Sequence, residues 1–427
     1  MWKAISVPMR SSPRARRVLV GALLALAMGA PAWAQDLGAQ WVDRINSRLH
    51  ADKTPYEGGQ FEYGAEGGVL MVYDSNIFLS ETNRQHEVIW VPYARARAGY
   101  SEPQFEVQAD LEADYKYYVQ TSGVRDNDER FFADIGYAGS TLGASVIQFI
   151  RHESDPLDAL FANRAERVVT DTIPRAYVDF TSVLAFELEG FFQTVHFLED
   201  ELGDTRDNMN GRLMGGLVYK GGPLGLDWIV QGGGLWIDYA KNTDLLGNPT
   251  EPPNVTGWLA RGGARGDLRP DLTVELYAGA VGVRSADFKV AGLPSRPGDA
   301  LTTMDASLFI RYKAIDGVTI SVAYSRQVDF GFDTDPFQVI NRGEILGEFT
   351  PLEHLVWVAR LQMDVARSDL GVKRTYGTVS LTGTYTVVEH FIVDAGLTYR
   401  GGKIYGSVAA PQDYTDYIFQ LGVAIAW

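Results

Sequence analysis

The chain has 427 residues, no cysteine, and 54 acidic against 38 basic side chains, a net charge of −16. This acidic balance argues against nucleic acid as a partner, and the lack of cysteine excludes disulfide bonds and a lipoprotein anchor. Aromatic residues make up 12% of the chain and glycine is abundant, with 45 residues. That combination is typical of strands with interfacial aromatic side chains and close backbone approaches.

Residues 1–34 have the pattern of a secretory signal peptide. An apolar stretch over 18–28 is followed by Ala32-Trp33-Ala34, a small-x-small cleavage site before Gln35. The segment contains no acid, and its basic residues are Lys3, Arg10, Arg14, Arg16 and Arg17. A membrane anchor is the alternative, but the apolar stretch is shorter than the roughly 20 residues that a spanning helix needs. Removing the five basic residues leaves 33 basic and 54 acidic side chains, a net charge near −21.

Residues 35–59 do not alternate, and they predict a short periplasmic N-terminal segment, helical around 41–49. Residues 60–427 are different, because apolar and polar residues alternate there in successive runs. In the run over 105–119, Asp110, Glu112 and Asp114 share one face, while Leu111 and Tyr115 lie on the other. A period of two is that of a β-strand, whereas a helix would distribute these charges around its circumference.

The alternating runs predict an all-β fold, a transmembrane antiparallel β-barrel of about 16–18 strands. Their expected starts lie near residues 61, 86, 103, 128, 141, 166, 183, 205, 224, 254, 271, 301, 317, 339, 354, 373, 389 and 413. The run at 141–151 alternates poorly. Short turns alternate with long loops along the chain, which is typical of outer-membrane barrels and puts both termini on the periplasmic side. A soluble β-sandwich or propeller is the alternative, with the apolar face turned inward.

The end of the chain predicts a closing strand and a C-terminal signal for barrel assembly. Bulky apolar residues there recur at every second position, at Tyr417, Phe419, Leu421, Val423, Ile425 and Trp427. The last strand of a barrel must pair with the first, and a terminal aromatic residue suits the interfacial girdle. We therefore expect the barrel assembly machinery to act on this segment.

The charged strand faces are predicted to line the lumen, while Leu111, Leu308, Val379, Leu397 and Leu421 face lipid. The candidate lumen-lining residues are Arg95, Arg97, Glu106, Asp110, Glu112, Asp114, Arg175, Glu187, Glu189, Arg212, Asp227, Arg261, Arg265, Asp305, Arg311, Arg360, Asp364, Arg374, Asp394 and Arg400. Cross-strand ion pairs are expected between Arg95 or Arg97 and the acidic row of the next strand. Such ladders either only stabilise the wall or form a selective surface for an acidic or hydroxyl-rich solute.

No motif predicts catalysis, a metal site or a cofactor, so the chain is not expected to be an enzyme. None of the six histidines has metal-ligand spacing, and no nucleophile elbow or Walker A motif occurs. His152 with Asp155, and His196 with Asp200, come nearest to a catalytic pair, and we expect both to be inert surface groups. Acidic clusters at 126–129 and 199–204 have irregular spacing, which favours a solvated surface over a Ca²⁺ site.

A motif in the first hairpin resembles one known family. The sequence Tyr73-Asp74-Ser75-Asn76-Ile77-Phe78-Leu79, followed by Glu81-Thr82-Asn83-Arg84, is similar to the opening of β-barrel porin 2 type outer-membrane proteins. The wider resemblance covers residues 60–427. Proteins of that family commonly accompany exopolysaccharide biosynthesis loci in Gram-negative bacteria, and no catalytic residues come with the family.

The resemblance implies a multi-pass protein of the cell outer membrane that is a conduit for a secreted polysaccharide. It also implies a periplasmic polysaccharide export protein as partner, one without its own membrane-spanning part. Two other readings stay open from the sequence. One is a general or nutrient-selective diffusion porin, and the other is an outer-membrane enzyme or adhesin.

Overall fold

The computed structural model describes residues 60–77, 84–121, 125–153, 166–198, 207–239, 242–243, 249–251, 254–287, 289–290, 298–330, 337–352, 354–368, 373–388, 390–405 and 412–426. The predicted signal peptide (1–34), the predicted periplasmic segment (35–59) and Trp427 lie outside these residues. Within them, no helix is long and apolar enough to cross a membrane.

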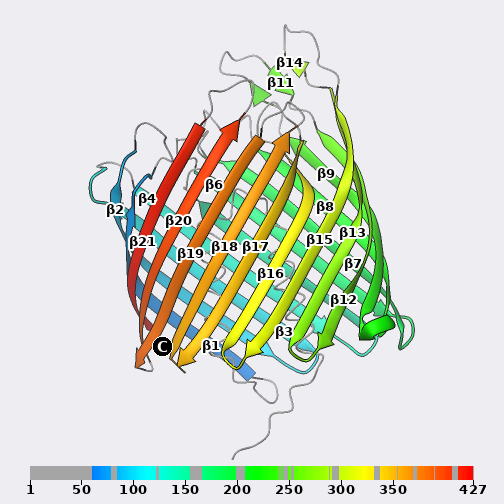
Figure 1. The fold of residues 1–427 in the computed structure, drawn as a ribbon, viewed down its shortest axis with the longest axis horizontal. Coiled ribbons are helices and arrows are strands. Elements are labelled where there is room, and N and C mark those ends of the chain that lie inside the picture. Colours follow the sequence, from blue (N-terminus) through cyan, green and yellow to red (C-terminus); the bar gives the residue numbers. More distant parts are fainter. Residues whose placement is uncertain are drawn as a thin grey trace, which may run out of the picture. The chain divides into compact units, whose positions relative to one another are not determined.

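Eighteen strands form one antiparallel sheet that closes on itself (Figure 1). They are β1 (Gln60–Asp74), β2 (Glu87–Ser101), β3 (Phe105–Tyr118), β4 (Arg125–Ala138), β5 (Leu142–Glu153), β6 (Arg167–Asp179), β7 (Leu184–Phe197), β8 (Asn208–Tyr219), β9 (Asp227–Tyr239), β12 (Val255–Arg269), β13 (Leu272–Ser285), β15 (Ala300–Ile315), β16 (Val318–Phe330), β17 (Phe337–Leu352), β18 (Leu355–Ser368), β19 (Lys373–Val388), β20 (Phe391–Tyr405) and β21 (Gln412–Ala426). Each strand pairs with its neighbours, and β21 pairs with β1 from Glu66↔Ala426 to Asp74↔Ile418. The predicted barrel is therefore confirmed, with eighteen strands.

The connections differ in length at the two rims of the barrel. One rim, here the short-turn rim, carries tight turns such as Asp316-Gly317 between β15 and β16, where Gly317 has a φ of 76° that favours glycine. It also carries the 3-10 helix η1 (Pro223–Gly225). The other, the long-loop rim, includes a separate small sheet of β10 (Asn242–Thr243), β11 (Pro249–Glu251) and β14 (Lys289–Val290). The start of β1 and the end of β21 lie towards the short-turn rim (Figure 1), as the loop rhythm predicts.

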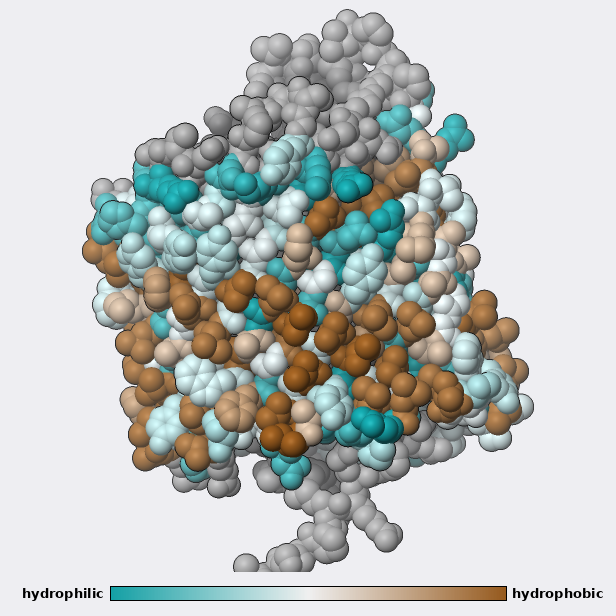
Figure 2. Space-filling view, viewed as in Figure 1, coloured by the Kyte–Doolittle hydropathy of each residue, from teal (hydrophilic) through white to brown (hydrophobic). Residues whose placement is uncertain are grey.

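The outer surface of the barrel is apolar. In β3, Leu111 is 55% exposed while its neighbours Asp110 and Glu112 are 4% and 2% exposed. Figure 2 shows a broad hydrophobic band across the outer wall, with hydrophilic residues above it near the long-loop rim. Val379, Leu397 and Leu421 are also exposed on this surface. An apolar outside with charges inside is the inverse of a soluble sandwich, so that alternative is wrong.

The alternating residues of the closing strand also point outward. Tyr417, Phe419, Leu421, Val423 and Ile425 are each about half exposed on β21. Bulky apolar side chains in this position match a wall that faces lipid. Their use as an assembly signal stays a prediction.

The described start of the first-hairpin motif, Tyr73 to Ile77, lies where the barrel closes, and residues 78–83 lie outside the described residues. Ser75 donates its backbone N–H to the carbonyl of Tyr417 (3.0 Å), and the Tyr417 N–H is donated to Ser75 Oγ (2.7 Å). Asn76 Nδ2 donates to the carbonyl of Thr415 at 3.3 Å. These bonds extend the contact of β1 with β21 beyond the last rung of the ladder. The motif therefore has a direct structural role in closing the wall.

A buried charge cluster completes this contact, and we call it the closure clasp (Asp74, Ser75, Arg400 and Asp416). Arg400 Nε lies 2.5 Å from Asp416 Oδ2, and its Nη2 lies 3.4 Å from Asp74 Oδ2. Ser75 Oγ donates to Asp416 Oδ1 at 2.8 Å. Asp416 is fully buried. One guanidinium thus joins carboxylates from the first and the last strand of the barrel.

Candidate functional site

The inner wall of the barrel is the candidate site, since it carries the charged side chains. By the alternation of each strand, the predicted lumen residues lie on the face opposite the exposed apolar residues. Arg95 donates from Nε to Asp110 Oδ1 at 2.8 Å, so a cross-strand ion pair between β2 and β3 forms as expected. Asp364 accepts from Arg342 Nε at 2.8 Å, and Arg360 Nε lies 3.0 Å from Glu344. That these faces line a water-filled lumen stays a prediction.

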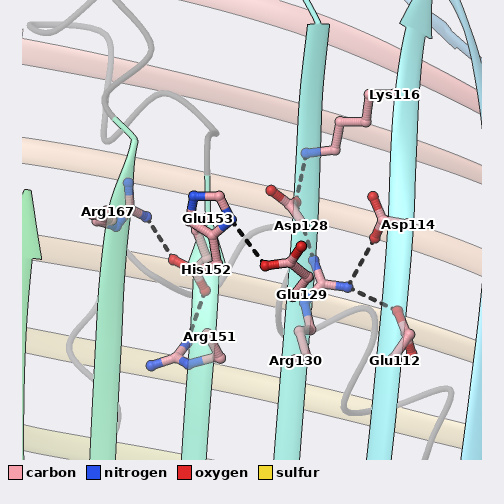
Figure 3. Close-up of polar contacts among 10 residues, drawn as sticks. All are labelled: Glu112, Asp114, Lys116, Asp128, Glu129, Arg130, Arg151, His152, Glu153 and Arg167. Carbon is pink, nitrogen blue, oxygen red and sulfur yellow. Dashed lines mark hydrogen bonds and ion pairs between the residues drawn. The ribbon is translucent and has the colours of Figure 1, made fainter. Parts of the chain in front are cut away.

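A network of charged side chains crosses β3 and β4 near the long-loop rim (Figure 3). Arg130 Nη1 lies 3.1 Å from Glu112 Oε1 and 3.4 Å from Asp114 Oδ2. Its Nη2 lies 3.4 Å from Asp128 Oδ2, which also accepts from Lys116 Nζ at 2.7 Å. Arg130 and Glu112 are cross-strand partners, and Asp114 follows Glu112 on the same face. The register therefore sets one guanidinium among three carboxylates.

The network continues across β5, β6 and β7. Arg151 Nη2 lies 2.6 Å from Asp171 Oδ2, and its Nη1 lies 3.1 Å from Glu153 Oε1. Glu153 accepts a second bond from Arg167 Nη2 at 2.8 Å. Gln193 Nε2 donates to Asp171 Oδ1 at 2.8 Å. We call the whole network the polar belt (Glu112, Asp114, Lys116, Asp128, Arg130, Arg151, Glu153, Arg167, Asp171 and Gln193). All of its ionised side chains are at most 13% exposed, so they are held in fixed pairs.

A second group of charges lies on β6 to β12, closer to the short-turn rim, and we call it the arginine cluster (Arg175, Arg212, Arg261 and Arg265). Glu189 lies within electrostatic reach of all four. Arg212 Nη2 is 3.6 Å from Glu189 Oε1. Arg265 donates to Glu187, with side chains that are 35% and 22% exposed. These groups are more open than the polar belt, and solute in the lumen would meet them more readily.

Arg261 connects the arginine cluster to neighbouring strands. Its Nε donates to Gln231 Oε1 at 3.0 Å, and its guanidinium carbon lies 4.6 Å from the centre of the Tyr277 ring. The Asp305 carboxylate is 3.9 Å from Nη1. A guanidinium that lies over an aromatic ring is attracted to the ring face, and its N–H groups stay available as hydrogen-bond donors. The wall here can offer hydrogen-bond donors and acceptors to a polar solute.

The two histidines singled out in the sequence, His152 and His196, have acidic partners among the described residues. His152 Nε2 lies 2.9 Å from Glu166 Oε1, and its Nδ1 lies 3.4 Å from Glu129 Oε2. His196 Nδ1 lies 2.5 Å from Asp207 Oδ2. Asp155 and Asp200 lie outside the described residues. Over the described part of the chain, no group of three or more His, Cys, Asp or Glu side chains could hold a metal ion.

Several residues of the inner wall escape the sequence analysis. Arg151 and Glu153 belong to the poorly alternating run, which the structure shows as a full strand, β5. Alternation is weak there because Ile147, on the inward face, is buried while Gln148 lies on the outward face. The spacing of Arg151 and Glu153, two residues apart, is the signal that could have identified them.

An apolar patch on the inner wall also escapes prediction. Met214, Ile237, Val255, Leu259, Val281, Val283 and Phe337 form one buried cluster, which we call the inner apolar cluster. It spans β8, β9, β12 and β13, together with the first residue of β17. Where both faces of a strand are apolar, a period of two is lost and cannot reveal which residues face inward.

No family model and no curated protein matches the chain. Among solved structures, the chain is similar to the ferric-catecholate import receptor Fiu of E. coli (9% identity, 87% of this chain and 82% of that chain, TM-score 0.44). It is also similar to the outer membrane protein OpdK of Pseudomonas aeruginosa (11% identity, 86% and 99%, TM-score 0.44) and to the alcaligin receptor FauA of Bordetella pertussis (12% identity, 88% and 77%, TM-score 0.40). Similarities this low carry no information about function.

Proposed function

We propose that this protein is an outer-membrane pore of a Gram-negative bacterium that passes hydrophilic solutes through its lumen. The observation that carries the proposal is the closed 18-stranded wall, apolar outside and charged inside. Over most of its height, the closed wall leaves no free strand edge, so its backbone is satisfied in lipid. Barrels of this strand number leave an aqueous channel unless chain segments fill it. The long-loop rim then faces the cell exterior and the short-turn rim faces the periplasm.

The inner wall suits passage rather than tight capture. Most charges of the polar belt are already paired with one another, so they offer hydrogen bonds without a strong net field. Arg212 and Arg265 of the arginine cluster are more exposed than the polar belt, and each lies close to a carboxylate. Hydroxyl-rich solutes can exchange such weak contacts as they move, whereas a strongly charged solute would have to break existing pairs.

The finer proposal is that the solute is a secreted exopolysaccharide, delivered by a periplasmic export protein. Its support is the mixed-charge inner wall and the resemblance in the first hairpin. Ser75 and Asn76 of the motif contact the last strand, so the resemblance supports a shared way of closing the wall rather than a shared solute. The competing proposal is a general diffusion porin. In either case, we propose that the barrel is not an enzyme.

Single-channel recording tests the pore. Purified barrel in planar bilayers should give discrete, ohmic steps of conductance, and a barrel that inserts without any current would contradict the proposal. Two variants locate the path of the current: R212A and R265A remove half-buried guanidinium groups of the arginine cluster and should change ion selectivity. R269A, at the short-turn rim with its side chain 59% exposed, should leave the selectivity unchanged.

Deletion of the gene separates the two proposed solutes. If the pore exports polysaccharide, the deletion strain loses its surface polysaccharide while the precursor is still made inside the cell. Normal surface polysaccharide combined with slower uptake of small sugars would contradict export and favour a diffusion porin. Complementation with the R269A variant should restore the parental phenotype in both cases.

A further inference from the structure

The wall of the barrel has an incomplete seam between β15 and β16. From the short-turn rim, the ladder of this pair runs only as far as Ala306↔Arg326. Both strands continue beyond that rung towards the long-loop rim. Residues 300–305 pair with β13 on one side, and 327–330 pair with β17 on the other. Within the described residues, these two edges share no rung, although each is a regular strand.

The edges do not stand apart but overlap. Phe337, which pairs with Phe330 at the tip of the β16–β17 hairpin, is fully buried in the inner apolar cluster with Val281 and Val283. Val328 of β16 packs against the same cluster. In the alternation of β16 and β17, both positions belong to the outward face, the face of Tyr324 and Ile345. Val328 and Phe337, on the outer face of this tucked edge (327–330 and 337–340), therefore lie against the inner face of the neighbouring wall.

Arg326 bridges the overlap. Its Nη2 donates to Thr303 Oγ1 of β15 at 3.1 Å, and its Nη1 donates to Asn341 Oδ1 of β17 at 3.0 Å. Thr303 is the rung partner of Val281, so its side chain belongs to the inward face of β15. An outward-facing residue of β16 thus reaches an inward-facing residue of β15. This contact is possible only because one edge lies inside the other.

We propose that the tucked edge is a gate of the pore, with a folded-in state, seen here, and a zipped state. In the zipped state, the ladder continues in its existing register, so that Asp305 meets Gln327 and Met304 meets Val328. The edges then lie side by side instead of overlapping. Because overlap shortens the circumference of the wall, zipping widens the lumen at the long-loop rim. The inference rests on the proposed pore function and adds a way in which passage through the pore is regulated.

Each state has its own stabilising contacts. The folded-in state buries Phe337 in the inner apolar cluster and packs Val328 against it. The zipped state instead adds rungs between two strand edges that, within the described residues, share none in the folded-in state. The apolar outer face of the tucked edge suits both states, since it can pack on the inner cluster or face lipid. Arg326 changes partners without becoming buried unpaired, because the long-loop rim lies near water.

Disulfide trapping tests the gate directly, because the chain has no cysteine. In the folded-in state, Met304 is 52% exposed on the outer face while Val328 packs inside, so the wall separates them. In the zipped state, they are direct cross-strand neighbours, at a spacing of the order that a disulfide requires. The M304C/V328C barrel should therefore cross-link on oxidation in membranes. The control pair L308C/Y324C occupies an existing rung four positions away along each strand and should cross-link in either state.

Cross-linking is detected from the mass of the linked peptides and does not depend on conductance. The experiment can therefore test the gate even if the proposed pore function is wrong. Cross-linking of both pairs supports the gate. Cross-linking of the control pair alone, with free thiols at 304 and 328 after prolonged oxidation, overturns it. Should the parent barrel conduct no current, the pore proposal fails while this result still stands.

A second variant covers the case in which the cysteine pair prevents folding. F337A leaves a cavity in the inner apolar cluster in the folded-in state but none where residue 337 faces fluid lipid, so the ratio of wide to narrow conductance levels should rise by about tenfold. F349A is the matched control, because Phe349 lies on the same strand and is 47% exposed on the outer wall. Identical level ratios in F337A, F349A and the parent barrel would overturn the gate.

Discussion

Replacing Arg400 with methionine should destabilise the barrel at the point where it closes. The guanidinium lies 2.5 Å from Asp416 and 3.4 Å from Asp74, and the three side chains are at most 10% exposed. Methionine keeps much of the aliphatic length but leaves two carboxylates facing each other without a counter-charge. Breaking a buried ion pair on one side costs about 3–5 kcal/mol, so we expect a loss of that size in the free energy of unfolding.

The matched control is R269M. Arg269 also forms an ion pair, 3.2 Å from Asp271, but the two side chains are 59% and 41% exposed. Such a pair is worth about 0–1 kcal/mol. Urea unfolding of the barrel in lipid vesicles, followed by tryptophan fluorescence and by heat-modifiable gel mobility, measures both variants. Adding D416N to R400M should recover part of the loss. Equal unfolding midpoints for R400M and R269M would show that the closure clasp does not stabilise the barrel.

Three further predictions concern the wall and its assembly. L381R puts a charge on the outer face at the middle of β19 and should lower the free energy of unfolding by about 2–4 kcal/mol. S380R, on the inward face, should lower it much less. Equal losses of unfolding free energy in vesicles would refute the assignment of faces. Deletion of Trp427 should lower the amount of barrel in the outer membrane, and unchanged levels on immunoblots would count against an assembly signal. The mature protein should begin at Gln35, and its intact mass should equal that of residues 35–427.

The sequence alone determines the strands and the direction of their faces. A period of two is local, so it can be read from a run such as 105–119 without knowing its neighbours, and the observed strand starts at Gln60 and Phe391 lie close to the predicted 61 and 389. Prediction is weakest where apolar residues occupy both faces, as in β5, because the alternation then has no contrast.

Only the tertiary structure decides which side chains meet across strands. Arg130 gathers Glu112, Asp114 and Asp128 through the register of β3 with β4, which a single run does not specify. Ser75 and Asp416 are 341 positions apart and meet only because the sheet closes.

The overlap of β15 and β16 is decided at the same level. Alternation assigns Val328 and Phe337 to an outward face, and their packing against the inner apolar cluster reverses that assignment locally. The physical reason is that alternation records the two faces of a strand, while the position of its edge depends on competition between backbone pairing and apolar packing. That competition involves β13, β15, β16 and β17 together, and no single segment of the sequence contains it.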